Sequence, residues 1–159
     1  MSKSNFYSVD DFRGPDCVGY LVSQAQSAMR PQVEALFERE EINFSQWRVL
    51  MCLRDGLANT CADISRELSH DKGSMTRLVD QLEARGFLER RRSGDDRRLV
   101  DLVLTGPGLA AVEGLIPKVV EYFNDLLEGF STTDARRLIE LLKRLRLAAL
   151  AASDTGSAP

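Results

Sequence analysis

The hydrophobic pattern in the middle of the chain predicts two short helices joined by a tight turn. Over residues 72–85, apolar side chains recur every three or four positions, the spacing of a helix that buries one face. These apolar positions are Met75, Leu78, Val79 and Leu82. Gly86 follows as a helix stop, and Thr60 with Asp63 can cap a shorter helix before the turn 69–71. Residues 60–86 are therefore expected to form a helix-turn-helix.

A β-hairpin is expected directly after the second of these helices. Residues 87–90 and 99–104 have strand-like patterns, and Ser93-Gly94-Asp95 supplies turn residues between them. A helix-turn-helix followed by a hairpin is a winged helix. The expected fold class is mainly α, an α+β winged helix, with residues 43–105 as the winged helix-turn-helix domain.

Long apolar helices are expected on both sides of this centre. One should begin after Pro15 and run to about Glu40, with a kink at Pro31. The segment 45–55 is apolar nearly all round, which is typical of a buried helix. Another helix should begin at Thr105, with an apolar seam close to a seven-residue repeat, and a last one after Ser131.

The domain organisation follows from these elements. Residues 15–42 and 106–152 are expected to form a helical dimerisation region, because their apolar surface exceeds what so small a centre can cover. Residues 1–14 should be a flexible arm and 153–159 a disordered tail. We therefore expect an intertwined homodimer; a monomeric bundle with the same helices folded back is the alternative.

Composition places the chain among soluble globular proteins, with 43% hydrophobic and 28% charged residues. It shows no secretory signal and no apolar run near the roughly 20 residues of a membrane span, so no membrane association and a cytoplasmic location are expected. The net charge of −3 argues weakly against nucleic acid, because phosphate neutralisation is local. Six arginines stand against three acidic residues in 85–98: Arg85, Arg90, Arg91, Arg92, Arg97 and Arg98 against Glu89, Asp95 and Asp96.

Short hydroxyl and cationic side chains stand at the start of the second helix, a position that suits contacts to base edges and phosphates. These candidate DNA contacts are Lys72, Ser74, Thr76 and Arg77. In the hairpin, Arg90, Arg91, Arg92 and Arg97 are either phosphate contacts or solvated strand charges. Double-stranded DNA is thus the expected partner.

Nothing in the sequence indicates an enzyme, a metal site or a cofactor. The three cysteines, Cys17, Cys52 and Cys61, are widely spaced, and the single histidine is His70. No tetrahedral ligand set or nucleophile–base pattern follows from these residues. Reduced, buried or half-buried thiols are the simplest interpretation.

Three segments together resemble the MarR family of bacterial transcription regulators, over about Pro15 to Ala149. They are 44–50 (FSQWRVL), 75–86 (MTRLVDQLEARG) and 96–98 (DRR), the last leading to Leu104-Thr105 with Gly108 after it. The resemblance implies a homodimer on a pseudo-palindromic operator, with a helix in the major groove and the wing in the flanking minor groove.

In that arrangement Arg98 would enter the minor groove, where an arginine gains from the negative potential, and Asp96 would orient it. A solvated ion pair within the hairpin is the alternative for these two residues. The DNA-contact set predicted for the wing is Arg91, Asp96, Arg97 and Arg98.

The resemblance also implies a small-molecule effector, often phenolic or aromatic, bound between the dimerisation helices and the winged helix. Residues that could line such a cleft are Tyr20, Met29, Arg30, Phe44, Trp47 and Met51. Aromatic and Met residues at helical spacing are also ordinary core residues. Arg30 would suit a carboxylate group on the effector.

Two other functions remain open alongside a ligand-released repressor. A redox sensor would use Cys17, near the start of the first helix, but Phe44 stands where that branch of the family has a supporting tyrosine. A protein-interaction module would use the same arginines without DNA. Steep salt dependence would distinguish DNA binding from that module.

Overall fold

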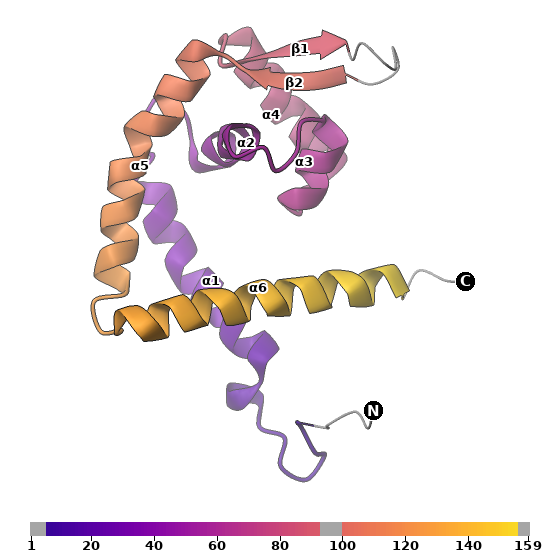
Figure 1. Cartoon of the computed structure of the whole chain (residues 1–159), viewed down its shortest axis with the longest axis vertical. Coiled ribbons are helices and arrows are strands. Elements are labelled where there is room, and N and C mark those ends of the chain that lie inside the picture. Colours follow the sequence, from indigo (N-terminus) through magenta and orange to yellow (C-terminus); the bar gives the residue numbers. More distant parts are fainter. Residues whose placement is uncertain (1–5, 93–99, 156–159) are drawn as a thin grey trace. The chain divides into compact units, whose positions relative to one another are not determined.

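The computed structural model describes residues 6–92 and 100–155, which belong to two compact units, Met1–Val119 and Val120–Pro159 (Figure 1). In chain order the elements are η1 (Gly14–Asp16, a 3-10 helix), α1 (Val18–Ala35), α2 (Phe44–Arg54), α3 (Cys61–Glu67), α4 (Lys72–Ala84), β1 (Leu88–Arg92), β2 (Val100–Leu104), α5 (Gly106–Leu126) and α6 (Thr132–Thr155). Most of α5 lies in the first unit, and its last turns and α6 lie in the second.

The expected helix-turn-helix is present as α3 and α4, and side chains cap both helices. The Thr60 hydroxyl accepts from the backbone N–H of Asp63 at 3.1 Å, and the Asp71 carboxylate accepts from that of Ser74 at 2.8 Å. Gly86, at φ +73°, ends α4 in the left-handed region that favours glycine. The Thr60 cap and the Gly86 stop are those that the sequence predicts, whereas Asp71, expected only as part of the turn, also caps α4.

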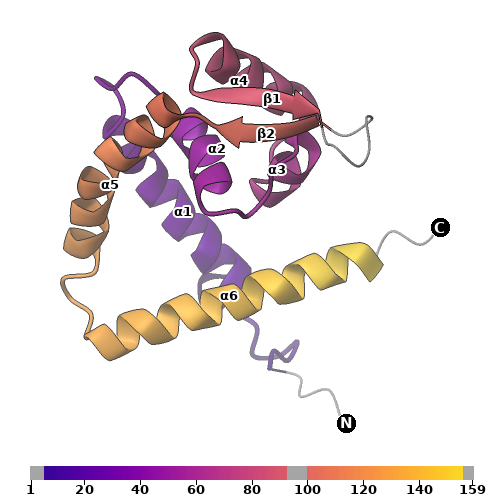
Figure 2. The ribbon, with the colours of Figure 1, turned by 45° about the horizontal axis from the view of Figure 1, so that its top comes forward.

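The hairpin is antiparallel, with Leu88 opposite Leu104 and Arg90 opposite Leu102. The segment before α3 adds to it, because the backbone N–H of Leu102 donates to the carbonyl of Asn59 at 2.7 Å. The expected turn Ser93-Gly94-Asp95 lies outside the described residues. The two strands lie beside α4 (Figure 2), which confirms the winged helix.

The core of the first unit is built where α2, α3, α4, the strands and α5 meet. Its fully buried members include Val49, Leu50, Ile64, Met75, Val79, Leu82, Leu88 and Val112. Leu78, the fourth apolar position of α4, is half-buried instead. The indole N–H of Trp47 donates to the carbonyl of Val112 at 3.3 Å and joins α2 to α5.

The N-terminal helix differs from its expected bounds. It ends at Ala35 rather than near Glu40, because Phe37 and Ile42 are buried from the connecting segment instead of continuing the helix. Pro31 lies inside the helix. The segment before it contacts the helix start: the Tyr7 hydroxyl donates to the Asp16 carbonyl at 3.3 Å and accepts from the backbone N–H of Val18 at 2.9 Å. Tyr7 thereby caps α1.

The second unit contains the end of α5 and the long helix α6. The Ser131 hydroxyl accepts from the backbone N–H of Asp134 at 3.1 Å, the cap expected for this helix. The helix continues to Thr155 and so includes the first three residues of the segment 153–159 that we expected to be a tail.

Candidate nucleic-acid interface

The four side chains predicted to contact DNA from α4 are all exposed on its first two turns. They alternate with the buried Met75 and Val79, so one face of the helix packs inward while the other meets solvent. Within the described residues, no ion pair involves Arg77, so its guanidinium is available to phosphate or to a guanine edge. The Thr76 hydroxyl donates to the Lys72 carbonyl at 2.9 Å, which leaves its oxygen as an acceptor.

The start of α4 also carries a carboxylate, Asp71. Hydrogen bonds from the hydroxyl and then the backbone N–H of Ser74 lower the pKa of Asp71 below its usual value near 3.8. The Ser74 hydroxyl is thus engaged by the cap, and a DNA contact through Ser74 would use the rest of its bonding capacity. Asp71 stabilises the helix end from which the predicted contacts project.

The structure distinguishes Arg90 from Arg91, two arginines of the wing that the sequence leaves equivalent. Arg90 binds two carboxylates of α4, Asp80 and Glu83, whereas Arg91 pairs with Glu89 on its own strand. Arg91 and Arg92 are exposed. Asp96, Arg97 and Arg98 lie outside the described residues, so their predicted roles stay predictions.

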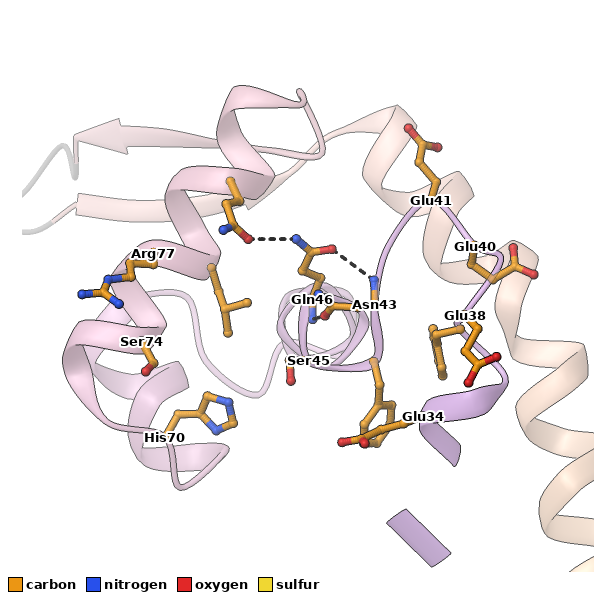
Figure 3. Close-up of a pocket in the computed structure, with 14 residues that line it drawn as sticks. Glu34, Glu38, Glu40, Glu41, Asn43, Ser45, Gln46, His70, Ser74 and Arg77 are labelled. Atoms are coloured by element: carbon orange, nitrogen blue, oxygen red, sulfur yellow. Dashed lines mark hydrogen bonds between the residues drawn. The ribbon is translucent and has the colours of Figure 1, made fainter. Parts of the chain in front are cut away.

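A groove of about 730 Å³ adjoins α4 (Figure 3). One wall consists of carboxylates from the end of α1 and the segment after it, and the other of His70, Ser74 and Arg77 from the turn and α4. Asn43, Ser45 and Gln46 of the α2 start lie between the walls. The acidic wall comprises Glu34, Glu38, Glu40 and Glu41, and the remaining lining residues are Phe37, Phe44, Leu78 and Gln81.

Of the six residues predicted for an effector cleft, Phe44 lines this groove. Trp47 is buried and packs 5.5 Å from Phe37 between ring centroids, as a core residue does. Tyr20 is exposed, while Met29 and Met51 are half-buried. The Arg30 guanidinium lies 2.8 Å from the Glu34 carboxylate, so it is already paired.

Arg48 is a candidate that sequence reasoning missed. Its guanidinium lies 5.8 Å from the Phe44 ring centroid and donates to the Leu68 carbonyl at 3.4 Å. Burial lowers the pKa of Arg48, and the nearby charge of Arg30 adds to this effect. The signal in the sequence was one cation inside the otherwise apolar stretch 47–53.

The three cysteines are free thiols at separate places. Burial raises the pKa of Cys52, which keeps that thiol protonated. Cys61 lies 3.9 Å from the Thr76 hydroxyl, and the half-buried Cys17 thiol has no hydrogen bond or ion pair with the described residues. Over those residues, no group of His, Cys, Asp or Glu side chains is arranged to hold a metal ion.

A capped helix with exposed cations, set beside a two-stranded wing, defines a winged-helix DNA-binding protein. The model of the MarR family matches residues 42–100. The uncharacterised HTH-type transcriptional regulator YwoH of Bacillus subtilis is 31% identical over 124 residues, 78% of this chain and 90% of YwoH. This chain belongs to the MarR family of transcription regulators.

One further relative is a transcriptional repressor, and one solved structure has a similar fold. The transcriptional repressor MprA of Escherichia coli is 27% identical over 79% of this chain and 72% of MprA. A mutant of E. coli MarR, solved in complex with operator DNA, is 26% identical with a TM-score of 0.69, over 80% of this chain and 92% of that one. The family consists of transcription regulators, in agreement with the expectation that this chain is not an enzyme.

Across residues 6–92 and 100–155, none of the helices has the length and apolar character needed to cross a membrane.

Proposed function

We propose that this protein is a homodimeric repressor that leaves its operator when a small effector binds. Each α4 would enter a major groove of a pseudo-palindromic operator, and each hairpin would reach the flanking minor groove. The observation that carries the proposal is the exposed start of α4, where Lys72, Thr76 and Arg77 project from a firmly capped helix end. The repressor MprA and the operator complex of E. coli MarR support it as relatives.

The unburied apolar surface of α1 supports a dimer. Within the described residues, Val33 is the one buried residue of this 18-residue helix, while Tyr20 and Leu21 are about half exposed. An isolated amphipathic helix is marginal in water without packing of its apolar face. In the second unit, α6 likewise exposes Leu138, Ile139, Leu141, Leu142, Leu147 and Leu150. A second copy of the chain is the partner that would cover these faces.

The groove beside α4 supports effector control, because it shares Ser74 and Arg77 with the predicted DNA contacts. A molecule bound there would occupy side chains that the operator needs. Three carboxylates of its acidic wall are paired with cations, Glu34 with Arg30, Glu40 with Lys118 and Glu41 with Arg85. Within the described residues Glu38 has no such ion pair, and its carboxylate favours a phenolic hydroxyl, which can donate to it, over an aromatic acid, which would meet like charge. Phe44 supplies an aromatic surface for the ring.

The DNA-binding half is tested by replacing Arg77 with Ala and measuring affinity for a duplex selected from random DNA. Loss of one phosphate contact should weaken binding at low salt. It should also make the negative slope of log K against log salt shallower by about 0.9. Arg39→Ala, an exposed arginine in the segment after α1, is the matched control and should bind as wild type does. The Arg98→Ala variant should lose operator binding while it remains dimeric. A wild-type slope near zero would instead favour a protein-interaction module.

The effector half is tested with phenols and the corresponding benzoates. Phenols should weaken operator binding and change the fluorescence of Trp47, and Glu38→Gln should reduce their effect more than Glu113→Gln, an exposed carboxylate on α5. If neither class of compound changes operator affinity or Trp47 fluorescence, the effector proposal fails and the DNA-binding proposal stands. Release by peroxide in the wild type but not in Cys17→Ser would establish the redox alternative.

A further inference from the structure

One arginine of the wing, Arg90, forms ion pairs with α4. From β1, the Arg90 Nη2 lies 2.6 Å from the Asp80 carboxylate of α4, and its Nη1 pairs with the Glu83 carboxylate. The backbone N–H of Arg90 also donates to Glu83, at 3.1 Å. The hydrogen bond that Arg90 donates to Asp80 is the largest cause of the raised pKa of Arg90; desolvation opposes it, and the hydrogen bond to Glu83 adds to it. The guanidinium fork therefore binds both carboxylates at once.

The place of this cluster in the fold lets it fix how β1 lies against α4. Arg90 is the central residue of β1, opposite Leu102. The exposed Asp80 and the half-buried Glu83 are one turn apart on α4. Isolated surface ion pairs contribute little to stability. A planar fork between two carboxylates, joined by a backbone hydrogen bond, fixes direction as well as distance.

We propose that Arg90 is a positioning residue that sets the orientation of the wing relative to α4, rather than a phosphate contact. This inference rests on the proposed use of both elements on one operator. Helix and wing must then fit two grooves together, so a small change in the angle between them loses contacts from one of them. Arg91, which pairs within its own strand, makes no such link to α4.

The two carboxylates allow a positioning role to be distinguished from a simple effect of charge. Asp80 lies one turn after Thr76 on α4, and its side chain is 57% exposed. A carboxylate beside the predicted DNA contacts repels phosphate, so its removal should tighten binding if charge alone mattered. We call the cluster of Arg90, Asp80 and Glu83 the clamp. A clamp predicts the opposite result, because removing either carboxylate would free the wing from α4.

The experiment uses the full-length protein and the selected duplex. Asp80→Asn and Glu83→Gln should each weaken binding about threefold to tenfold, the size of coupling typical of contacting residues. Glu89→Gln, which makes the same change of charge on β1 but breaks only the Arg91 pair, is the control and should bind as well as wild type or better. Hydroxyl-radical footprints should lose protection in the flanking minor groove and keep it at the centre.

Substitutions of Arg90 distinguish clamp from phosphate contact. Arg90→Gln and Arg90→Lys should both weaken binding, because lysine keeps the charge but cannot form the fork, and neither should change the salt slope. A slope lowered by about 0.9 in Arg90→Gln, with near wild-type binding by Arg90→Lys, would identify a phosphate contact and overturn the proposal. Tighter binding by Asp80→Asn would also overturn it.

Thermal melting of each variant and the footprint distinguish loss of folding from a misplaced wing. An unfolded fraction reduces protection over the whole site rather than only at the flanks. If wild type binds no duplex, the proposed function fails, whereas the clamp fails when wild type binds and the carboxylate variants bind equally well.

Discussion

At Gly108 the backbone of α5 lies close to Phe87, the residue before β1. A Cβ built at this position would lie 1.9 Å from the Phe87 carbonyl oxygen and 2.9 Å from a methyl group of Leu104. The Phe87 carbonyl cannot move freely, because it accepts from the backbone N–H of Thr105 at 3.2 Å. Any side chain at 108 must therefore displace backbone at the junction of β1, β2 and α5.

We predict that Gly108→Ala destabilises the protein by about 1–3 kcal/mol, the usual cost of overpacking a close contact. Thermal and urea unfolding followed by circular dichroism would measure the loss. Gly114→Ala is the control on the same helix, where a Cβ meets nothing within 4 Å. It should be neutral or stabilising by up to about 1 kcal/mol. Equal melting of the two variants would contradict the contact.

Side chains in repeating patterns were predictable from the sequence, but pairing partners were not. Hydroxyls and cations between the apolar positions of α4 had to face outward once Met75 and Val79 faced inward. Arg90 and Arg91 look alike in the sequence, because the difference between them is set by how β1 packs on α4, where Asp80 stands ten residues away. Arg48 was missed for the same reason.

Among the elements, α4 depends on its N-terminal cap, Asp71. The folded-state pKa of this carboxyl is lowered, so Asp71 stabilises the fold above its unfolded pKa near 3.8 and ceases to do so as the pH falls through the folded value. We predict that Asp71→Ala melts below wild type at pH 7. The difference should shrink progressively as the pH falls below 3.8.

The control for charge is Asp71→Asn, which keeps an acceptor for the Ser74 N–H and cannot titrate. Its melting temperature relative to Asp71→Ala should not depend on pH. Melts at a series of pH values from 2 to 7 provide the measurement, and other carboxyls cancel because they titrate in all three proteins. A constant gap between wild type and Asp71→Ala would show that the ionised carboxylate is not what stabilises α4.

Helix boundaries agree with the sequence prediction where a capping residue marks the start of the helix. Thr60 and Ser131 each precede a helix and each makes the expected bond. Asp71 was expected only as a turn residue, and it caps α4 as well. The end of α1 carried no such mark, since Phe37 and Ile42 continue an apolar pattern that the folded chain buries from a non-helical segment. The cap from Tyr7 comes from eleven residues before Val18, beyond the range of capping motifs.

At the scale of the whole molecule, the dimerisation region predicted for 15–42 and 106–152 stays a prediction, because it concerns contacts between two copies. Within one chain, α1 and most of α5 lie in one compact unit with the winged helix, and α6 lies in the other. Periodicity identifies an apolar helical face but not the surface that covers it. In the dimer that we propose, the exposed leucines of α6 would pack against a second copy.

The dimer proposal predicts that a charge in these faces separates the copies. Leu142→Lys on α6 and Leu21→Lys on α1 place an ammonium group where a 44% and a 53% exposed leucine stand, and burying it against a second copy would require desolvation. Analytical ultracentrifugation should give twice the 17.8 kDa chain mass for wild type and a shift toward a single chain for the variants. The melting temperature of wild type should rise with protein concentration, and that of a monomeric variant should not. Leu57→Lys, at a 60% exposed leucine after α2, is the control and should stay dimeric.

Variants that separate into single chains should bind a full palindrome no better than one half-site. The two α4 helices of a dimer gain affinity from the second contact only while the copies stay together. Dimeric variants with wild-type affinity would place the interface elsewhere on the chain.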